Sequence, residues 1–344
     1  RLSLEEQIVL KVLAVVGRPV SEEELDVLLP GTVARQKPWL AINPEISKQL
    51  LLATADGLEF RHALIRQAIY EVMTQKQLRT LHGNVVDLLE SQCSGSDAQD
   101  QMLGTLAYHN EHAGRISQAI KLLEREGARS LMSDMAPLDA IQTLKKLISL
   151  DREHPDTGAV QQQKIKLPGR FRTQKMFTRR AHWQRLLGES YAKVGESTPS
   201  VEHLGEALVE LGLSLPLPRH RVLREFSLGL SRRLVFAPRA LRANSLSVDE
   251  REAIVELVAA HDRFSRLCYT RGESAQGVAS ALLATSLAER LGPSSELCNS
   301  YCMMSNHFHI LLEVPMAPEE RGADWSDEEL LDHLSELYSM QQMG

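Results

Sequence analysis

The stretch LGESYAKVGESTPSVEHLGEAL, which spans residues 187–208, decides the fold. Leu187 and Tyr191 lie four positions apart in it, and Leu204 and Ala207 lie three apart, which is the spacing of residues on one face of an α-helix. Pro199 marks a break between the two helical segments. The stretch therefore predicts a helical hairpin.

The residue order in this hairpin resembles that of tetratricopeptide repeats, whose pattern runs L-G, Y, F and A. The matching residues are Leu187, Gly188, Tyr191, Leu204 and Ala207, with Ser200 in place of an alanine. Such repeats place small residues twelve positions apart, where two helices cross closely. Two earlier pairs have this spacing: Ala107 with Ala119, followed by Leu123, and Ala128 with Ala140, followed by Leu144. The resemblance implies helical hairpins over residues 75–300, with later helices at 219–234, 248–271 and 275–291.

The composition is that of an ordinary globular chain with few aromatic residues. The 344 residues include 5% aromatic and 24% charged residues and carry a net charge of −6, which gives no general attraction to nucleic acid. Four scattered cysteines (Cys93, Cys268, Cys298, Cys302) imply no disulfide framework and favour a reducing cytoplasm. We find no signal peptide and no membrane-spanning run, and we expect no membrane partner. Because the chain begins with Arg1, we expect it to be a piece of a longer protein.

The first 74 residues predict a winged helix. Ser3 with Glu6, and Ser21 with Glu24, form capping boxes for two helices, and a third helix is expected at 44–49. Residues 50–54 and 58–61 flank an Asp-Gly turn and predict a β-hairpin. The candidate recognition segment, 42–49, has a single basic residue, so we expect a packing or hinge module in preference to a DNA reader.

The segments that follow resemble the arm of STAND-class signalling ATPases. The sequences FRHALIRQAIYEVM (residues 60–73) and QLRTLHGNVVDLLE (residues 77–90) have apolar residues at helical spacing, including Leu64, Ala68 and Val72 in the first. In that class, associated with adenylyl cyclases or LuxR-type regulators, a winged helix leads from the nucleotide-binding domain into tetratricopeptide-type repeats. The resemblance covers residues 1–300 and implies a scaffold that binds protein partners or a missing ATPase. The chain contains no phosphate-binding P-loop, so no cofactor is expected for this part.

Two polar segments have alternative interpretations. Residues 164–185 interleave basic and aromatic side chains, which is typical either of a nucleic-acid stripe or of a linker that runs into a repeat helix with its aromatic residues packed. The tetrapeptide His109-Asn110-Glu111-His112 resembles a zinc-protease motif, but its histidines are three apart and not four. We interpret it as a helix surface.

The segment YCMMSNHFHILLEVP, residues 301–315, is typical of a strand with two potential metal ligands. His307 and His309 point to one face of a strand, while Phe308 points to the other. The context resembles REP-associated tyrosine transposases of the HUH superfamily, in which such histidines bind Mg²⁺ or Mn²⁺ and a tyrosine attacks single-stranded DNA. Tyr338 and Gln342 have the family's Y-x-x-x-Q spacing and would be the nucleophile and a further metal ligand. The acidic residues near Tyr338 would repel DNA, so we interpret the Y-x-x-x-Q spacing as a coincidence. A zinc site with Cys298 and Cys302 fits no common ligand spacing.

The sequence thus predicts a mainly α chain in three parts: a winged helix at 1–74, helical repeats at 75–300, and a truncated α+β transposase-like segment at 301–344. The preferred function is a non-enzymatic interaction scaffold fused to an incomplete transposase fragment. The alternative is a metal-dependent tyrosine transposase that acts on single-stranded DNA.

Overall fold

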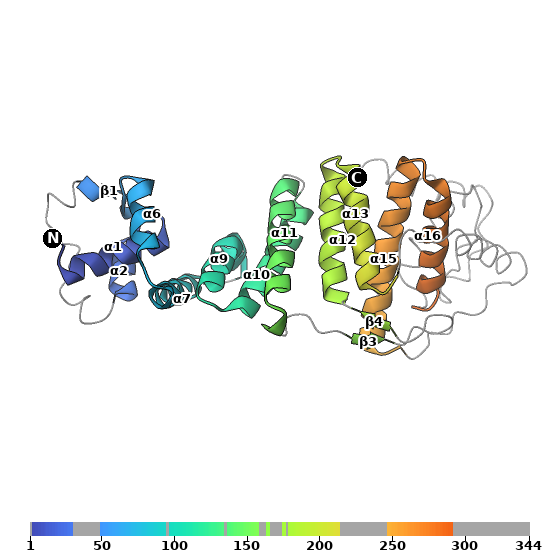
Figure 1. The fold of residues 1–344 in the computed structure, drawn as a ribbon, viewed down its shortest axis with the longest axis horizontal. Coiled ribbons are helices and arrows are strands. Elements are labelled where there is room, and N and C mark those ends of the chain that lie inside the picture. Colours follow the sequence, from blue (N-terminus) through green and yellow to red (C-terminus); the bar gives the residue numbers. More distant parts are fainter. Residues whose placement is uncertain are drawn as a thin grey trace, which may run out of the picture. The chain divides into compact units, whose positions relative to one another are not determined.

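A computed structural model of the chain describes residues 2–29, 49–93, 96–133, 136–157, 163–165, 174–176, 178–213 and 246–291 (Figure 1). These residues are mainly helical, as predicted. The chain divides into two compact units, Arg1–Gln163 with Phe177–Glu210, and Lys164–Met176 with Leu211–Gly344. The domain boundaries expected from the sequence at residues 74 and 300 stay predictions. The helices predicted at 44–49 and 219–234, and the whole of 301–344, lie largely or entirely outside the described residues.

The first elements are two short helices and a β-hairpin. Helix α1 (Leu4–Val16) and helix α2 (Glu22–Leu28) both begin at the predicted capping boxes, in which serine and glutamate side chains bond reciprocally with the helix backbone. Strands β1 (Leu51–Thr54) and β2 (Gly57–Phe60) pair antiparallel across the Asp-Gly turn. The residue between the two helices, Val20, adds an antiparallel bridge to Leu58 of β2. The predicted hairpin is therefore confirmed.

Helix α6 (Ala63–Glu71) leaves one of its apolar faces exposed. Ile69 and Tyr70 pack against the core beside α1 and β2. Leu64 and Val72 are 80% and 82% exposed, and Ala68 between them is exposed too. The helical spacing of these three residues is confirmed, but the face that they share is not the buried one, because the helix carries apolar residues on two sides and α1 covers only one of them.

The remaining described helices follow one another along the two units. In the first unit these are α7 (Gln75–Gln92), α8 (Ser96–Gln101), α9 (Leu103–His112), α10 (Ile116–Met132), α11 (Pro137–Glu153), the 3₁₀ helix Pro155–Thr157, α12 (Thr178–Lys193) and α13 (Ser197–Glu210). The described part of the second unit contains α15 (Val248–Thr270) and α16 (Ser274–Ala288), and short strands β3 (Gln163–Ile165) and β4 (Gln174–Met176) form a two-stranded sheet. One continuous apolar core runs from α1 to α12.

Three helix pairs, α9–α10, α12–α13 and α15–α16, turn in the same way. Each turn has a glycine with positive φ: Gly114 at 81°, Gly195 at 82° and Gly272 at 76°. The amide of the next residue donates to the carbonyl five positions earlier, at 2.8 to 3.0 Å. This is a Schellman closure of the first helix, and it needs a residue that tolerates a left-handed backbone. The second helix starts within two residues, so the two helices lie antiparallel.

Small residues sit where the paired helices cross. In each pair the first residue lies seven positions before the turn glycine and the second lies five positions after it. The pairs are Ala107 and Ala119, Gly188 and Ser200, and Ser265 and Gly277. Ser200, which stands where the repeat pattern has alanine, donates its hydroxyl to the Gly188 carbonyl at 2.7 Å. Ser265 donates to the Gly277 carbonyl at the same distance from the opposite helix. The third pair was not predicted from the sequence, because a serine and a glycine reverse their places in it.

The closeness of the α12–α13 crossing predicts that Gly188→Ala destabilises the protein. A methyl group there would lie 2.8 Å from Leu204 Cγ and 3.1 Å from the Ser200 carbonyl oxygen. We expect a loss of about 1–3 kcal/mol in the free energy of unfolding, since overpacking outweighs the gain in helix propensity. Gly104→Ala in α9 is the control, because no atom lies within 4 Å of its added methyl. It should be neutral or stabilising by up to about 1 kcal/mol. Urea unfolding measures both, and equal effects would contradict the close crossing.

Candidate functional site

The residues that the sequence marked for metal and DNA chemistry lie outside the described residues. They are His307, His309, Tyr338 and Gln342. Within the described ranges no group of three or more His, Cys, Asp or Glu side chains is placed to hold a metal ion. The same ranges contain no helix that is both long enough and apolar enough to span a bilayer.

The later part of the basic segment 164–185 is packed into the helical array. Trp183 is fully buried on α12, and its indole N–H donates to Glu124 of α10 at 2.8 Å. Arg179 pairs with the same carboxylate, and Arg180 pairs with the buried Asp151 of α11 at 2.6 Å. Burial is the largest single influence and would raise the pKa of Glu124, but the hydrogen bonds from Arg179 and Trp183 and the nearby positive charge together lower it. For residues 178–185 the interpretation as a packed repeat helix is therefore confirmed.

The tetrapeptide 109–112 is not the helix surface that we predicted. His109 and Asn110 are buried on α9, where α7 packs against it. These residues are buried because α7 covers this face of α9. Helix α7 starts 34 residues before His109, so no pattern within the tetrapeptide could predict this contact. His109 and Asn110 belong to two adjacent polar sites, a histidine cluster and a pocket.

The histidine cluster joins α6, α7 and α9. His82 of α7 is its centre: its Nε2 lies 2.9 Å from the Tyr70 hydroxyl, and its Nδ1 lies 2.8 Å from Nδ1 of His109. The rings of Tyr108 and His112 also lie against His82, with centroids at 5.7 and 4.9 Å. Two facing Nδ1 atoms can bond only if one carries a proton and the other does not. The cluster is therefore a chain of neutral hydrogen bonds.

Burial disfavours charge on three members of this cluster. Burial, with contributions from His109 and His112, lowers the pKa of His82 to about 3. Burial also lowers the pKa of His109 to about 4, with smaller contributions from His112 and Arg18. Burial raises the pKa of Tyr70 to about 12, with Tyr108 as the second cause. His82, His109 and Tyr70 are uncharged near neutral pH, so they form a packing contact that acid would disrupt.

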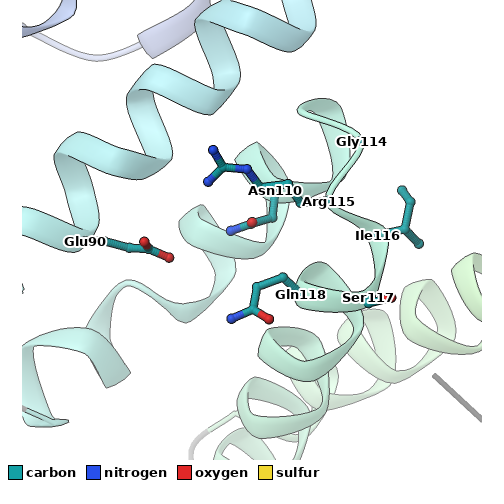
Figure 2. A pocket seen from close by; sticks show the side chains of 7 residues that line it. All are labelled: Glu90, Asn110, Gly114, Arg115, Ile116, Ser117 and Gln118. Atoms are coloured by element: carbon teal, nitrogen blue, oxygen red, sulfur yellow. The ribbon is translucent and has the colours of Figure 1, made fainter. Parts of the chain in front are cut away.

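The pocket lies where the end of α7 meets the turn between α9 and α10. Figure 2 shows Glu90 reaching toward it from α7, with Asn110, Arg115 and Gln118 facing it from the hairpin. Gly114, Ile116 and Ser117 complete the lining, and its volume is about 480 Å³. Arg115 forms an ion pair with Asp87 of α7 at 3.0 Å. The lining is polar and carries both signs of charge.

Asn110 is the buried member of the pocket. Its Nδ2 donates to the Leu106 carbonyl at 2.8 Å, which fixes the orientation of the amide. Its Oδ1 is buried and has no hydrogen-bond partner among the described residues. An acceptor left in this state costs about 1–3 kcal/mol, so it is a strong site for an incoming donor.

Comparisons with known proteins show a likeness in structure but none in sequence. No protein-family model matches the chain, and no curated protein matches its sequence. The structure is similar to the crystal structure of a STAND protein (Signal Transduction ATPase with Numerous Domains) with a tetratricopeptide repeat sensor from Pyrococcus horikoshii. The identity is 12%, the TM-score is 0.24, and the match covers 90% of this chain and 48% of that one. This chain thus spans about half the length of that protein, and so low a TM-score carries no argument about function.

Partial signals for both polar sites are present in the sequence. The segment QLRTLHGNVVDLLE (residues 77–90) contains His82, and the tetrapeptide 109–112 contains His109, but no local pattern links two residues 27 positions apart. For Asn110 a signal did exist. It stands four residues before the turn glycine Gly114, the position that Tyr191 holds before Gly195. Aligning the hairpins on their turn glycines would have marked it as a departure from the pattern.

The histidine cluster predicts an acid-sensitive fold. The folded pKa values of His82 and His109 lie below the ordinary value of 6.5, so the unfolded chain takes up these protons first. The free energy of unfolding should therefore fall as the pH drops from about 6.5 toward 4, by up to about 1.4 kcal/mol per pH unit for each imidazole. Urea unfolding at several pH values measures the slope.

His109→Gln should make this acid slope shallower, whatever its effect on stability at pH 7. His154→Gln is the control, because His154 is exposed, and it should leave the slope unchanged. An identical acid slope in wild type and His109→Gln would contradict the role of the cluster.

Proposed function

We propose that this chain is a protein-binding helical scaffold, the arm of a signalling ATPase of the STAND type, with a winged helix at its N-terminus. The observation that carries the proposal is the exposed apolar stripe on α6. Leu64, Ala68 and Val72 follow one another at intervals of four residues, so they share one face of the helix. No described element covers this face. Rows of exposed apolar residues on a helix are typical of protein interfaces.

The order of the N-terminal elements supports a winged helix. Helix α1 is followed by the bridging residue Val20, then α2, and later by the hairpin β1–β2. Its charges favour a protein partner over DNA, because α2 begins with Glu22, Glu23 and Glu24. Module and repeats are joined by a fixed contact: Glu24 accepts hydrogen bonds from Arg18 and from Gln92 of α7. Arg18 is the largest cause that lowers the pKa of Glu24 to about 2. A partner docked on α6 would therefore act on a module already held against α7.

The α6 stripe is tested by photo-crosslinking. A photoreactive amino acid at position 64 should capture a partner in the cells that make this protein, and mass spectrometry identifies it. The control position is Val209, an exposed valine on α13. With the purified partner, Leu64→Glu should weaken binding at least about tenfold, since burying a leucine contributes about 1.5–3 kcal/mol.

Val209→Glu should leave that affinity unchanged. Crosslinks that are no more frequent from position 64 than from position 209 would refute the docking surface, as would full affinity in Leu64→Glu.

The alternative, a tyrosine transposase acting on single-stranded DNA, rests on the sequence pattern of residues 301–315 and on Tyr338. It is tested with a labelled hairpin-bearing DNA strand and Mn²⁺. A scaffold forms no covalent adduct with this strand. An adduct that disappears in Tyr338→Phe and in His307→Ala would establish the transposase and displace the scaffold as the main function.

A further inference from the structure

Few contacts hold helix α6 in place. It has nine residues, none of them buried, and its cap residue His62 makes no side-chain hydrogen bond to the helix. It lies beside α1 (Figure 1), and the half-buried Ile69 and Tyr70 pack against the core. Arg66 donates to the Ala14 carbonyl of α1 over a long distance, 3.4 Å. Because an isolated helix of this length is unstable in water, α6 depends on these contacts.

The tyrosine of α6 covers a buried histidine of α7. The Tyr70 hydroxyl lies 2.9 Å from Nε2 of His82, and the two rings meet edge to face with centroids 5.9 Å apart. His82 is fully buried, and its other ring nitrogen faces His109 of α9. Among the described residues Tyr70 is the hydrogen-bond partner of Nε2. Movement of α6 would therefore open this nitrogen to water.

The described groups that contact His82, or act on its partners, are neutral or positive near neutral pH. They are Tyr70 and Arg66 on α6, Tyr108, His109 and His112 on α9, and Arg18, which follows α1. None of these groups is a carboxylate. A proton on the buried His82 would have no counter-charge among them, and burial lowers the pKa of His82 to about 3.

The segments on either side of α6 are fixed separately from it. Before the helix, the amide of Arg61 donates to the Leu50 carbonyl at 2.9 Å, which ties the end of β2 to its neighbour. After the helix, Met73 is buried and Thr74 begins α7 with a capping box. Release of α6 therefore unpacks only its half-buried face and leaves the apolar core from α1 to α12 in place.

We propose that acid releases α6 from α1, β2 and α7 while the helical array stays folded, because His82 takes up a proton once Tyr70 has moved away. Protonated His82 donates Nδ1–H to Nδ1 of His109 and Nε2–H to water. The contact between α7 and α9 is thus kept in the released form. A released α6 also unfolds, since a helix of nine residues is unstable alone.

Release of α6 would also remove the surface proposed for docking. Leu64, Ala68 and Val72 share one face only while the helix is formed. A partner that binds this face would therefore lose affinity in acid. This consequence rests on the proposed function, whereas the release itself requires no partner.

The test is hydrogen exchange of the full chain, followed by mass spectrometry at about pH 7.5 and about pH 5. Each exchange rate is divided by the intrinsic rate at the same pH, which gives an opening constant for each helix. The constant of α6 should rise roughly 30-fold in acid, because a freed His82 has the ordinary pKa of 6.5 in place of about 3. At both pH values the constant of α12 should be at least about tenfold smaller, since α12 lies in the main core.

The variants identify the group that takes up the proton. His82→Gln should abolish the rise, because glutamine does not titrate. His62→Gln is the matched control, since His62 is an exposed histidine at the start of α6, and it should keep the full rise. Tyr70→Phe removes the hydrogen bond and should raise the opening constant of α6 at about pH 7.5 by about two- to tenfold.

Several results would overturn the proposal. They are equal opening constants for α6 and α12, an α6 constant that is the same at both pH values, an undiminished rise in His82→Gln, and loss of the rise in His62→Gln. If His82→Gln fails to fold, the comparison of α6 with α12 in wild type and in His62→Gln still decides. Failure of partner capture from position 64, with acid release of α6 intact, would refute the docking surface and leave this inference standing.

Discussion

The helix pairs α9–α10, α12–α13 and α15–α16 approach closely where neither helix carries a large side chain, and the described part of the array depends on that constraint. The turn glycines Gly114, Gly195 and Gly272 reverse the chain tightly enough to make the helices neighbours. Small residues at fixed distances from each glycine then let the backbones meet. Where the small residue is serine, its hydroxyl bonds to the facing glycine carbonyl, so a polar group is buried without loss. The turn glycine and the small residues at the crossing thus act together to pair the two helices.

Helix α7 connects the helical hairpins to the N-terminal module, α1, α2 and the β-hairpin. On one side it receives α1 and α2, with Gln92 bonded to the same carboxylate that Arg18 holds. On the other side it covers α9, where His82 meets His109. The contact between His82 and His109 is buried, which makes it specific in geometry, whereas the bond from Gln92 to Glu24 is exposed. A disturbance of α7 would therefore reach both the module and the first hairpin.

The candidate functional features occur where residues depart from the repeat pattern. A hairpin in which every position is filled by apolar residues has nothing to offer a ligand. Asn110 breaks the pattern at a buried position, and its Oδ1 has no hydrogen-bond partner among the described residues. The exposed stripe on α6 is a departure of another kind, an apolar face where the module meets solvent.

The sequence by itself determined the features that depend on neighbouring residues. Capping boxes, the Asp-Gly hairpin and the helical hairpin at Gly188 and Ser200 were predicted because their signals lie within one or two turns of chain. The sequence did not determine which helix face is buried: the spacing of Leu64 on α6 did not reveal that its face is exposed, and His109 and Asn110 were predicted to lie on a surface. Burial there depends on α1 and α7, which are distant along the chain, and only the tertiary structure brings them together. Packing across such distances leaves no periodic trace in the residues that it covers.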